Sequence, residues 1–168
     1  MAKRITAVTT ITPTATADAA TTLASGTFPC IVQGGTGTQR VNILEIYMGG
    51  QAGSSTPTFM ILARDSTVGV TNSNGTGQTD AAMDASTAAL TAATLTGNTN
   101  TTPPQRSTTL KLLNLSFNAF GGIVRWVAAP GEEISIIGNT ASLGEVSLSA
   151  FTGGTPGAMG THLIYEAF

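Results

Sequence analysis

The stretch GIVRWVAAPGEEISIIG, residues 122–138, gathers residue types from which active sites are often built. It holds the single tryptophan of the chain beside Arg125, followed by the adjacent carboxylates Glu132 and Glu133. Two carboxylates can act as general acid and base when both face the same substrate. Neighbouring residues of a strand point to opposite faces, so this pair favours a structural role.

The middle of the same stretch has the composition of a turn. Pro130 presets φ at one turn position, and Gly131 permits a positive φ at the next. Both lie between two runs of β-forming residues. We therefore expect a hairpin or a tight strand connection between residues 122–128 and 132–138.

The side chains beside this turn are expected to stabilise the fold. Arg125 is predicted to pair with Glu132 or Glu133 across the turn, a contact that contributes about 0–1 kcal/mol when exposed. Trp126 shares a strand face with Val124. It is predicted to be a core or interface anchor.

Two further segments lack the partners that chemistry requires. His162 is the single histidine, and no Gly-x-Ser-x-Gly elbow marks out a serine nucleophile. We expect His162 to be an ordinary residue of the last strand. The glycine-rich segment QGGTGTQR, residues 33–40, lacks the Gly-Lys-Ser/Thr ending of a phosphate-binding loop and is predicted to be a flexible connection between strands.

The remaining candidates for ligand binding or modification also have structural explanations. Asp80 and Asp84 would share one side of a helix, but their spacing is not that of an EF-hand, and helix capping by Asp80 is expected instead. Glycosylation triplets begin at Asn74, Asn100 and Asn114, and we interpret them as chance matches in a chain rich in Thr and Asn. The sequence thus predicts no catalytic, cofactor-binding or metal-binding site.

The elements that would position these residues are β-strands. Short runs of β-forming residues alternate with Gly, Pro, Thr and Ser, the pattern of an all-β sandwich or barrel. No long segment shows a helical period. Strands are predicted near residues 3–12, 27–33, 40–48, 58–65, 108–118, 122–128, 132–138, 144–151 and 160–167.

The strand expected at 144–151, GEVSLSAF, alternates cleanly. Val146, Leu148 and Ala150 point to one face, and the polar residues between them, which include Ser147, point to the other. This pattern predicts a strand with one face in water.

Three other strands do not alternate cleanly. VNILEIYM, residues 41–48, and TFMILA, residues 58–63, are apolar on both faces. Strands covered on both sides in so small a domain suggest an interface between subunits. In TLKLLNLSF the pattern shifts between Leu112 and Leu113, which indicates a bulge or two covered faces.

Two segments lack the patterning of a core. Residues 1–26 are predicted to form an extended arm, rich in Thr and Ala from 13 to 25, that mediates attachment or exchanges onto a neighbour. Residues 27–168 are predicted to form a single β-sandwich domain. Within it we expect a long loop at 66–107, in which residues 80–95 form one short helix.

Composition limits the class of protein. Charged residues are 10% of the 168 residues, against about 25% in an average domain, so copies of the chain or partners are expected to cover much of the surface. Seven Lys and Arg spread along a chain of net charge −2 argue against nucleic acid as a partner. The single cysteine, Cys30, is expected to be a small buried apolar side chain. The first fifteen residues lack the apolar segment of a signal peptide, and no window is apolar enough to span a membrane.

The second half of the chain resembles a group of small virion structural proteins of tailed bacteriophages. The likeness is carried by TLKLLNLSFNAFGGIVRWVAAPGEEISIIG and GEVSLSAFTGGTPGAMGTHLIYEAF, which share an Arg-Trp-Val-Ala-Ala-Pro-Gly turn, a Phe-Thr-Gly loop and a final strand closing on the acidic Glu166. RVNILEIYMGGQAGSSTPTFMILARDSTVG is similar to the early hairpin of the same group. Together these stretches cover somewhat more than half of the chain.

This resemblance implies a jelly-roll-like β-sandwich of about eight strands, often trimeric, that decorates or cements a capsid shell. The group has no catalytic residues to carry over. We therefore expect a non-enzymatic protein without cofactors, assembled in the host cytoplasm and located on the capsid surface of the virion. Its expected partners are the major capsid protein and further copies of itself, with no nucleic acid and no membrane.

Two other functions compete with this expectation. A receptor- or glycan-binding module of a head fibre or tail could use the same fold, because a fold alone does not determine function. An enzyme, for instance a capsid-associated hydrolase, is disfavoured by the single histidine and by the missing carboxylate or metal constellation.

Overall fold

The computed structural model of the chain is all-β, with twelve strands in two antiparallel sheets and no helix in the part that it describes. This confirms the expected fold class. The described residues are 5–15, 30–33, 40–67, 76–77, 81–86, 93–96, 105–137, 144–153 and 157–167.

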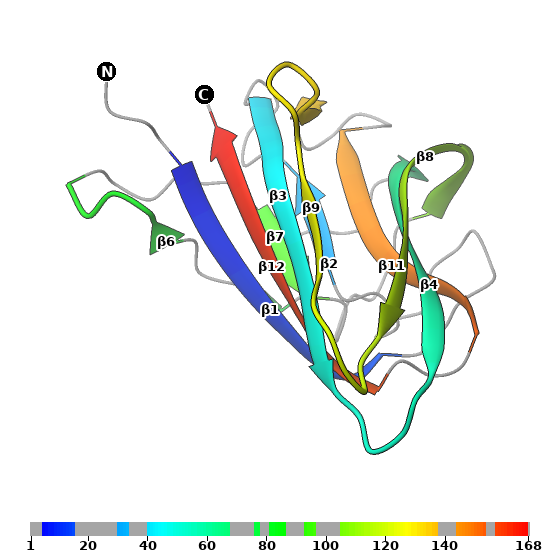
Figure 1. Cartoon of the computed structure of the whole chain (residues 1–168). Coiled ribbons are helices and arrows are strands. Elements are labelled where there is room, and N and C mark those ends of the chain that lie inside the picture. The colour runs from blue at the N-terminus through cyan, green and yellow to red at the C-terminus, as the bar shows by residue number, and fades with distance from the viewer. Residues whose placement is uncertain are drawn as a thin grey trace.

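One sheet, here called sheet A, forms one layer of the fold (Figure 1). In spatial order it contains β10 (Ile134–Ile137), β3 (Arg40–Gln51), β12 (Gly157–Ala167), β1 (Ile5–Ala15) and β6 (Ala81–Ala82), and β9 (Val124–Val127) also pairs with β3.

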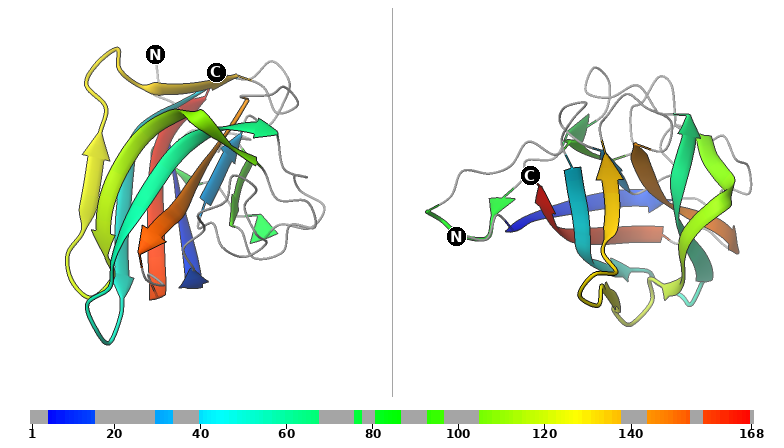
Figure 2. Two further views of the ribbon diagram at one scale, coloured as in Figure 1. Left: turned by 90° about the vertical axis from the view of Figure 1, so that its right-hand side faces the viewer. Right: turned by 90° about the horizontal axis from the view of Figure 1, so that it is seen from above.

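The second sheet, sheet B, forms the other layer, and Figure 2 shows the two layers from the side and from above. In spatial order it contains β5 (Thr76–Gly77), β7 (Ala93–Thr96), β2 (Cys30–Gln33), β11 (Glu145–Gly153), β4 (Pro57–Thr67) and β8 (Gln105–Asn118).

The main strands pair in a nested order. β1 pairs with β12, β2 with β11, β3 with β9 and β10, and β4 with β8. The strands of the first half of the chain therefore pair with those of the second half in reverse order. The two sheets form a β-sandwich in which β9 and β10 together occupy one strand position.

The core lies between the sheets and is filled by alternate residues of both. Strands β3 and β12 supply apolar side chains from sheet A, and β4, β8 and β11 supply them from sheet B. The fully buried side chains of greatest volume are Tyr165, Phe117, Ile43, Ile46, Met48, Met60, Leu62 and Ile136.

A β-bulge in β3 explains why residues 41–48 look apolar on both faces. Ile164 pairs with Glu45 and Tyr165 with Ile43, so Leu44 is an extra residue in this strand. The shift keeps Ile43 and Ile46 on the same inner side although they are three positions apart. The change of phase at Leu44 therefore accounts for the two-faced pattern within one copy of the chain, and the expected interface between subunits stays a prediction.

The outer faces of β4 and β11 are covered by the chain itself. Ile61 and Ala63 are buried, although they point away from the core side chains of β4. The polar face of β11, which was expected in water, is also fully buried, including Ser147 and Ser149. For β8, the pairing shifts between Leu113 and Lys111, which confirms the bulge expected at this place.

The segment 122–138 is a strand connection and not a hairpin. β9 and β10 both pair with β3 and lie one after the other along its edge. Between them the Glu132 amide donates to the Ala129 carbonyl at 2.9 Å, and Gly131 has a φ of 86°. The predicted Pro-Gly turn is therefore present, but it interrupts one edge strand and does not reverse the chain.

The expected arm and loop both contain strands. Residues 5–15, within the segment 1–26, form β1, which pairs along β12 in sheet A. The range 66–107 contains β5, β6 and β7, of which β7 extends sheet B and β6 extends sheet A. The helix expected at 80–95 is wrong for the described part, where residues 81–86 are strand and turn and 93–96 are strand.

Trp126 is half-buried and packs against the core from β9, which confirms the predicted anchoring role in the core. We expect Trp126→Ala to lower the free energy of unfolding by about 2–3 kcal/mol, less than for a fully buried tryptophan because part of the ring is in water. Val127→Ala, on the outward side of the same strand, should change it by less than about 0.5 kcal/mol. Urea denaturation of both variants would measure the difference, and equal effects would contradict the anchoring role.

Candidate functional site

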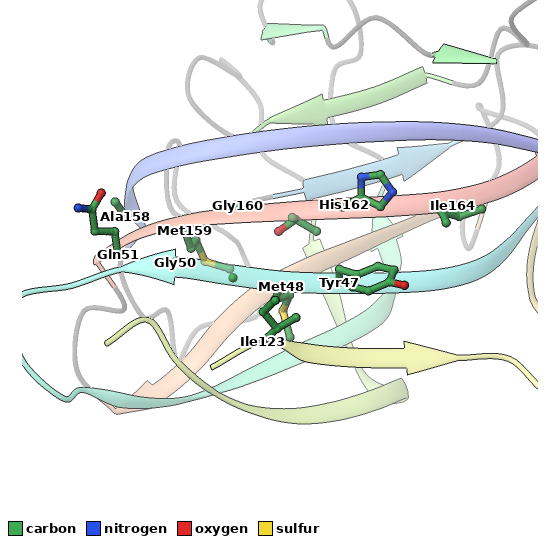
Figure 3. A pocket seen from close by; sticks show the side chains of 12 residues that line it. Tyr47, Met48, Gly50, Gln51, Ile123, Ala158, Met159, Gly160, His162 and Ile164 are labelled. Atoms are coloured by element: carbon green, nitrogen blue, oxygen red, sulfur yellow. The ribbon is translucent and has the colours of Figure 1, made fainter. Parts of the chain in front are cut away.

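The outer face of sheet A carries an open groove of about 620 Å³ along β3 and β12. Figure 3 shows that its side chains come from these two strands and from Ile123, just before β9. No Asp, Glu, Lys or Arg lines it. The lining residues are Tyr47, Met48, Gly49, Gly50, Gln51, Ile123, Ala158, Met159, Gly160, Thr161, His162 and Ile164.

Glycines form the floor of the groove. Gly49 lies opposite Gly160 in the β3–β12 pair, so two neighbouring positions lack side chains on the outer face. A Cβ atom added at Gly49 would meet no atom within 4 Å. Packing does not require glycine at this position, and the space above it is empty because the side chain is missing.

Gly50 has a different reason to be glycine. A Cβ atom added there would lie 2.7 Å from the Ala158 carbonyl oxygen and 2.8 Å from the Ala119 Cβ. Both distances are shorter than van der Waals contact, and the first involves backbone that cannot turn away. Gly50 therefore allows β3 to lie close both to β12 and to the turn after β8.

A hydrogen-bond network around Asn118 holds the groove rim in place. Its side-chain oxygen accepts from the amides of Thr56 (3.2 Å) and Phe120 (3.1 Å), and its side-chain amide donates to the Ser55 hydroxyl at 2.7 Å. One side chain thus ties the β3–β4 loop to the β8–β9 turn. That turn carries Ile123, which is 74% exposed at the edge of the groove.

Aromatic and charged side chains cluster at the opposite end of the groove. The rings of Tyr47 and His162 meet edge to face with centroids 5.7 Å apart. The guanidinium of Arg125 lies 5.0 Å from the Tyr47 centroid and donates to Glu45 Oε2 at 2.8 Å. Glu45, Tyr47, Arg125 and His162 come from three adjacent strands, because Tyr47 is paired with Arg125 on one side and with His162 on the other.

The ion pair of this cluster corrects a prediction. Arg125 pairs with Glu45 of β3 and not with Glu132 or Glu133. The hydrogen bond from Arg125 lowers the pKa of the Glu45 carboxyl, and the same bond raises the pKa of Arg125. Glu133 instead accepts from the Gly131 amide at 3.0 Å, which lowers the pKa of Glu133. The Glu133 carboxylate therefore stabilises the turn itself.

A second cluster of charged and hydroxyl side chains lies on the buried outer face of sheet B. Asp65 and Glu145 are fully buried there, and Arg106 and Ser149 are hydrogen-bonded to each other. The Ser147 hydroxyl donates to Asp65 Oδ1 at 2.6 Å. We call these five residues the polar layer; they come from β4, β8 and β11, which are adjacent in sheet B.

The polar layer favours a protonated carboxyl group. Burial raises the pKa of Asp65 to about 7, against its ordinary value of 3.8, although hydrogen bonds with Ser147 and Glu145 and the charge of Arg106 act in the opposite direction. Two carboxyl groups can hydrogen-bond to each other only if one of them is protonated. The raised pKa of Asp65 therefore favours the neutral form of this carboxyl group and reduces the buried negative charge.

The other predicted residues have the following places. His162 is on β12, the last strand, as expected, but it lines the groove. Asp84 accepts from the amide and hydroxyl of Ser86 in a turn, not in a helix, and these hydrogen bonds lower the pKa of Asp84. Asn114 is on β8, and the backbone of Cys30 is in β2, whereas its side chain is outside the described residues.

Three predictions concern segments that the structure does not describe. They are the residues 34–39 of the glycine-rich connection, the proposed cap Asp80, and the triplets at Asn74 and Asn100. Among the residues that are described, no group of three or more His, Cys, Asp or Glu side chains could hold a metal ion. The same residues include no helix that is long and apolar enough to cross a membrane.

Gly49 and Gly50 form a matched pair for a stability test. Gly50→Ala should lower the free energy of unfolding by about 1–3 kcal/mol, because the new Cβ overlaps backbone. Gly49→Ala should leave it unchanged or raise it by up to about 1 kcal/mol, because the new methyl enters open space and reduces the entropy of the unfolded chain. Denaturant titration of both variants would measure these free energies of unfolding. If Gly49→Ala lowered the free energy of unfolding as much as Gly50→Ala does, the space above Gly49 would not be open.

The raised pKa of Asp65 predicts a pH dependence of stability. Because the pKa of Asp65 is raised on folding, the folded state binds an extra proton between about pH 4 and pH 7. Its stabilising contribution is complete below pH 4 and falls by up to about 4 kcal/mol as the pH rises to 7. Asp65→Asn should flatten this part of the curve and be more stable than the unmodified protein at pH 8. Glu132→Gln, on the exposed turn, is the control, and parallel curves for all three proteins would contradict the raised pKa of Asp65.

Comparison with known proteins identifies no relative. No family model, no curated protein and no solved structure matches the chain. The function proposed below is therefore supported by the residues and their geometry, together with the resemblance noted in the sequence.

Proposed function

We propose that this chain is a non-enzymatic virion structural protein that decorates or cements a bacteriophage capsid shell as a homo-oligomer. The proposal includes the major capsid protein as its partner, and neither nucleic acid nor a membrane. The sequence resemblance, the nested sandwich and the scarcity of charge all support it. In this role the protein works by binding other proteins through its surface, and it catalyses no reaction.

The observation that carries the proposal is a pair of exposed aromatic side chains at one end of the sandwich. Phe59 is 56% exposed and Phe120 58%. Phe59 pairs with Ser116 near the end of β8, and Phe120 lies in the turn that follows. Exposed large apolar groups that lie near each other on a surface mark sites of protein contact.

This end of the sandwich is rigid enough to serve as a contact. Besides the Asn118 hydrogen bonds, the Ala52 amide donates to the Ala119 carbonyl at 3.1 Å. The β3–β4 loop and the β8–β9 turn, which both connect the two sheets, are therefore fixed to each other. A preorganised surface loses less conformational entropy on binding than a flexible one. Repetition on a lattice would then add many modest contacts into firm attachment.

A receptor- or glycan-binding module remains the second candidate, because one observation favours it. Tyr47, Arg125, Glu45 and His162 combine an aromatic ring with charged hydrogen-bonding groups beside an open groove. Sugars are bound by side chains of both kinds. Loss of glycan binding on Tyr47→Ala, with the melting temperature unchanged, would favour this second function.

Attachment to shells tests the first function. We expect the purified protein to co-sediment with capsid shells that lack it, and Phe59→Ser combined with Phe120→Ser to weaken binding at least about tenfold through the loss of two apolar contacts. Met83→Ser is the matched control, since Met83 is 61% exposed but lies in the turn after β6. Absence of binding by the unmodified protein would refute the proposed function.

A further inference from the structure

We propose that the groove on the outer face of sheet A is the contact between copies of this chain. The occupant is a second copy, whose Ile123 enters the groove. This inference rests on the proposed function, because it locates the homo-oligomer contact that the function includes. It assigns self-association and shell attachment to different residues.

The first argument is the pairing of a projection with a hollow on one surface. Ile123 stands at the rim of the groove with three quarters of its surface exposed, and Gly49 and Gly160 leave space on the floor beside it. In a contact between two copies related by a two-fold axis, the same patch on each copy must present both halves of the contact. An exposed isoleucine next to an open apolar groove meets this requirement.

The second argument is charge. No Asp, Glu, Lys or Arg lines the groove, and beside it Glu45 and Arg125 neutralise each other at 2.8 Å, while the Glu166 carboxylate further along β12 accepts a hydrogen bond from Asn42. A second copy would bring the same surface, so an unpaired charge here would meet its own sign. The internal ion pair removes that repulsion. A strongly charged partner would find no opposite charge in the groove.

The third argument is area. Strand β3 has 12 residues and β12 has 11. With about 3.3 Å per residue and about 4.8 Å between strands, four of the five strand positions of sheet A, those of β9 with β10, β3, β12 and β1, present a face of about 40 Å by 19 Å, on the order of 750 Å². A stable interface covers about 800 Å² on each partner. The face is therefore large enough for a stable contact between copies.

Sheet B offers no comparable face in the described part of the chain. Its outer side chains Ile61, Ala63 and Ser147 are already buried within one copy. The low charge of the sequence favours a surface that is covered by other molecules, and sheet A is the layer whose described outer face carries an open apolar groove.

Sedimentation velocity of the full chain over a range of concentrations tests this proposal. We expect the unmodified protein to be an oligomer, and Gly49→Leu, which fills the groove, to raise its dissociation constant about tenfold or more. Gly53→Leu is the matched control, because a Cβ atom there also meets nothing within 4 Å but the residue lies in the β3–β4 loop. Ile123→Asn, a change at an exposed site, should weaken association similarly and provides the test if Gly49→Leu does not fold.

A cross-link identifies the contact directly. A photoreactive residue at position 123, in a mixture of isotopically light and heavy protein, should form light–heavy products with β3 or β12 residues that line the groove. An unmodified protein that sediments as a monomer, or groove-filled variants that remain fully oligomeric, would overturn the inference. Oligomers that fail to bind shells would overturn the proposed function alone. A monomer whose shell binding is lost in Gly49→Leu would show that the capsid, and not a second copy, occupies the groove.

Discussion

The position of β3 is the constraint on which the rest of the molecule depends. This strand pairs with β12 on one side and with β9 and β10 on the other, and its inner residues form much of the core. One extra residue, Leu44, keeps Ile43 and Ile46 both pointing inward. Without that bulge, the residues from Glu45 onward would change faces, which would bury Glu45 and Tyr47 and expose Ile46 and Met48.

The same bulge determines what the outer face can do. Because Glu45 and Tyr47 point outward, they meet Arg125 and His162 from the two neighbouring strands. Beyond them, Gly49 continues the outer side as an open floor. The polar cluster and the apolar groove are consecutive parts of one outward face, and their order follows from alternation along β3.

Local pattern was enough to predict nine of the twelve described strands but not the short β5, β6 and β7, nor the surroundings of any strand. All nine expected strand regions contain a strand, since alternation and turn residues act over a few positions. The partner of Arg125 lies 80 positions earlier in the chain, so the sequence around the Pro-Gly turn could not identify Glu45. The polar face of β11 looked solvent-exposed because Asp65 and Arg106, which satisfy its serines, come from other strands. The groove was missed for a related reason, since two glycines form a floor only when β3 and β12 are paired.

The outer faces of sheets A and B differ in which side chains they carry and in whether the chain itself covers them. Burial of charged groups in the polar layer opposes folding unless each is paired, and the charge of Arg106 together with the raised pKa of Asp65 reduces the net buried charge. The hydrogen bonds of the layer join β4, β8 and β11, so they favour the observed strand order over alternatives that would leave a charge unmatched. On sheet A no such layer is required, because the groove itself is lined by uncharged side chains. The described outer side chains of sheet B are thus buried within one chain, and the groove of sheet A keeps apolar surface whose burial by another molecule would add stability.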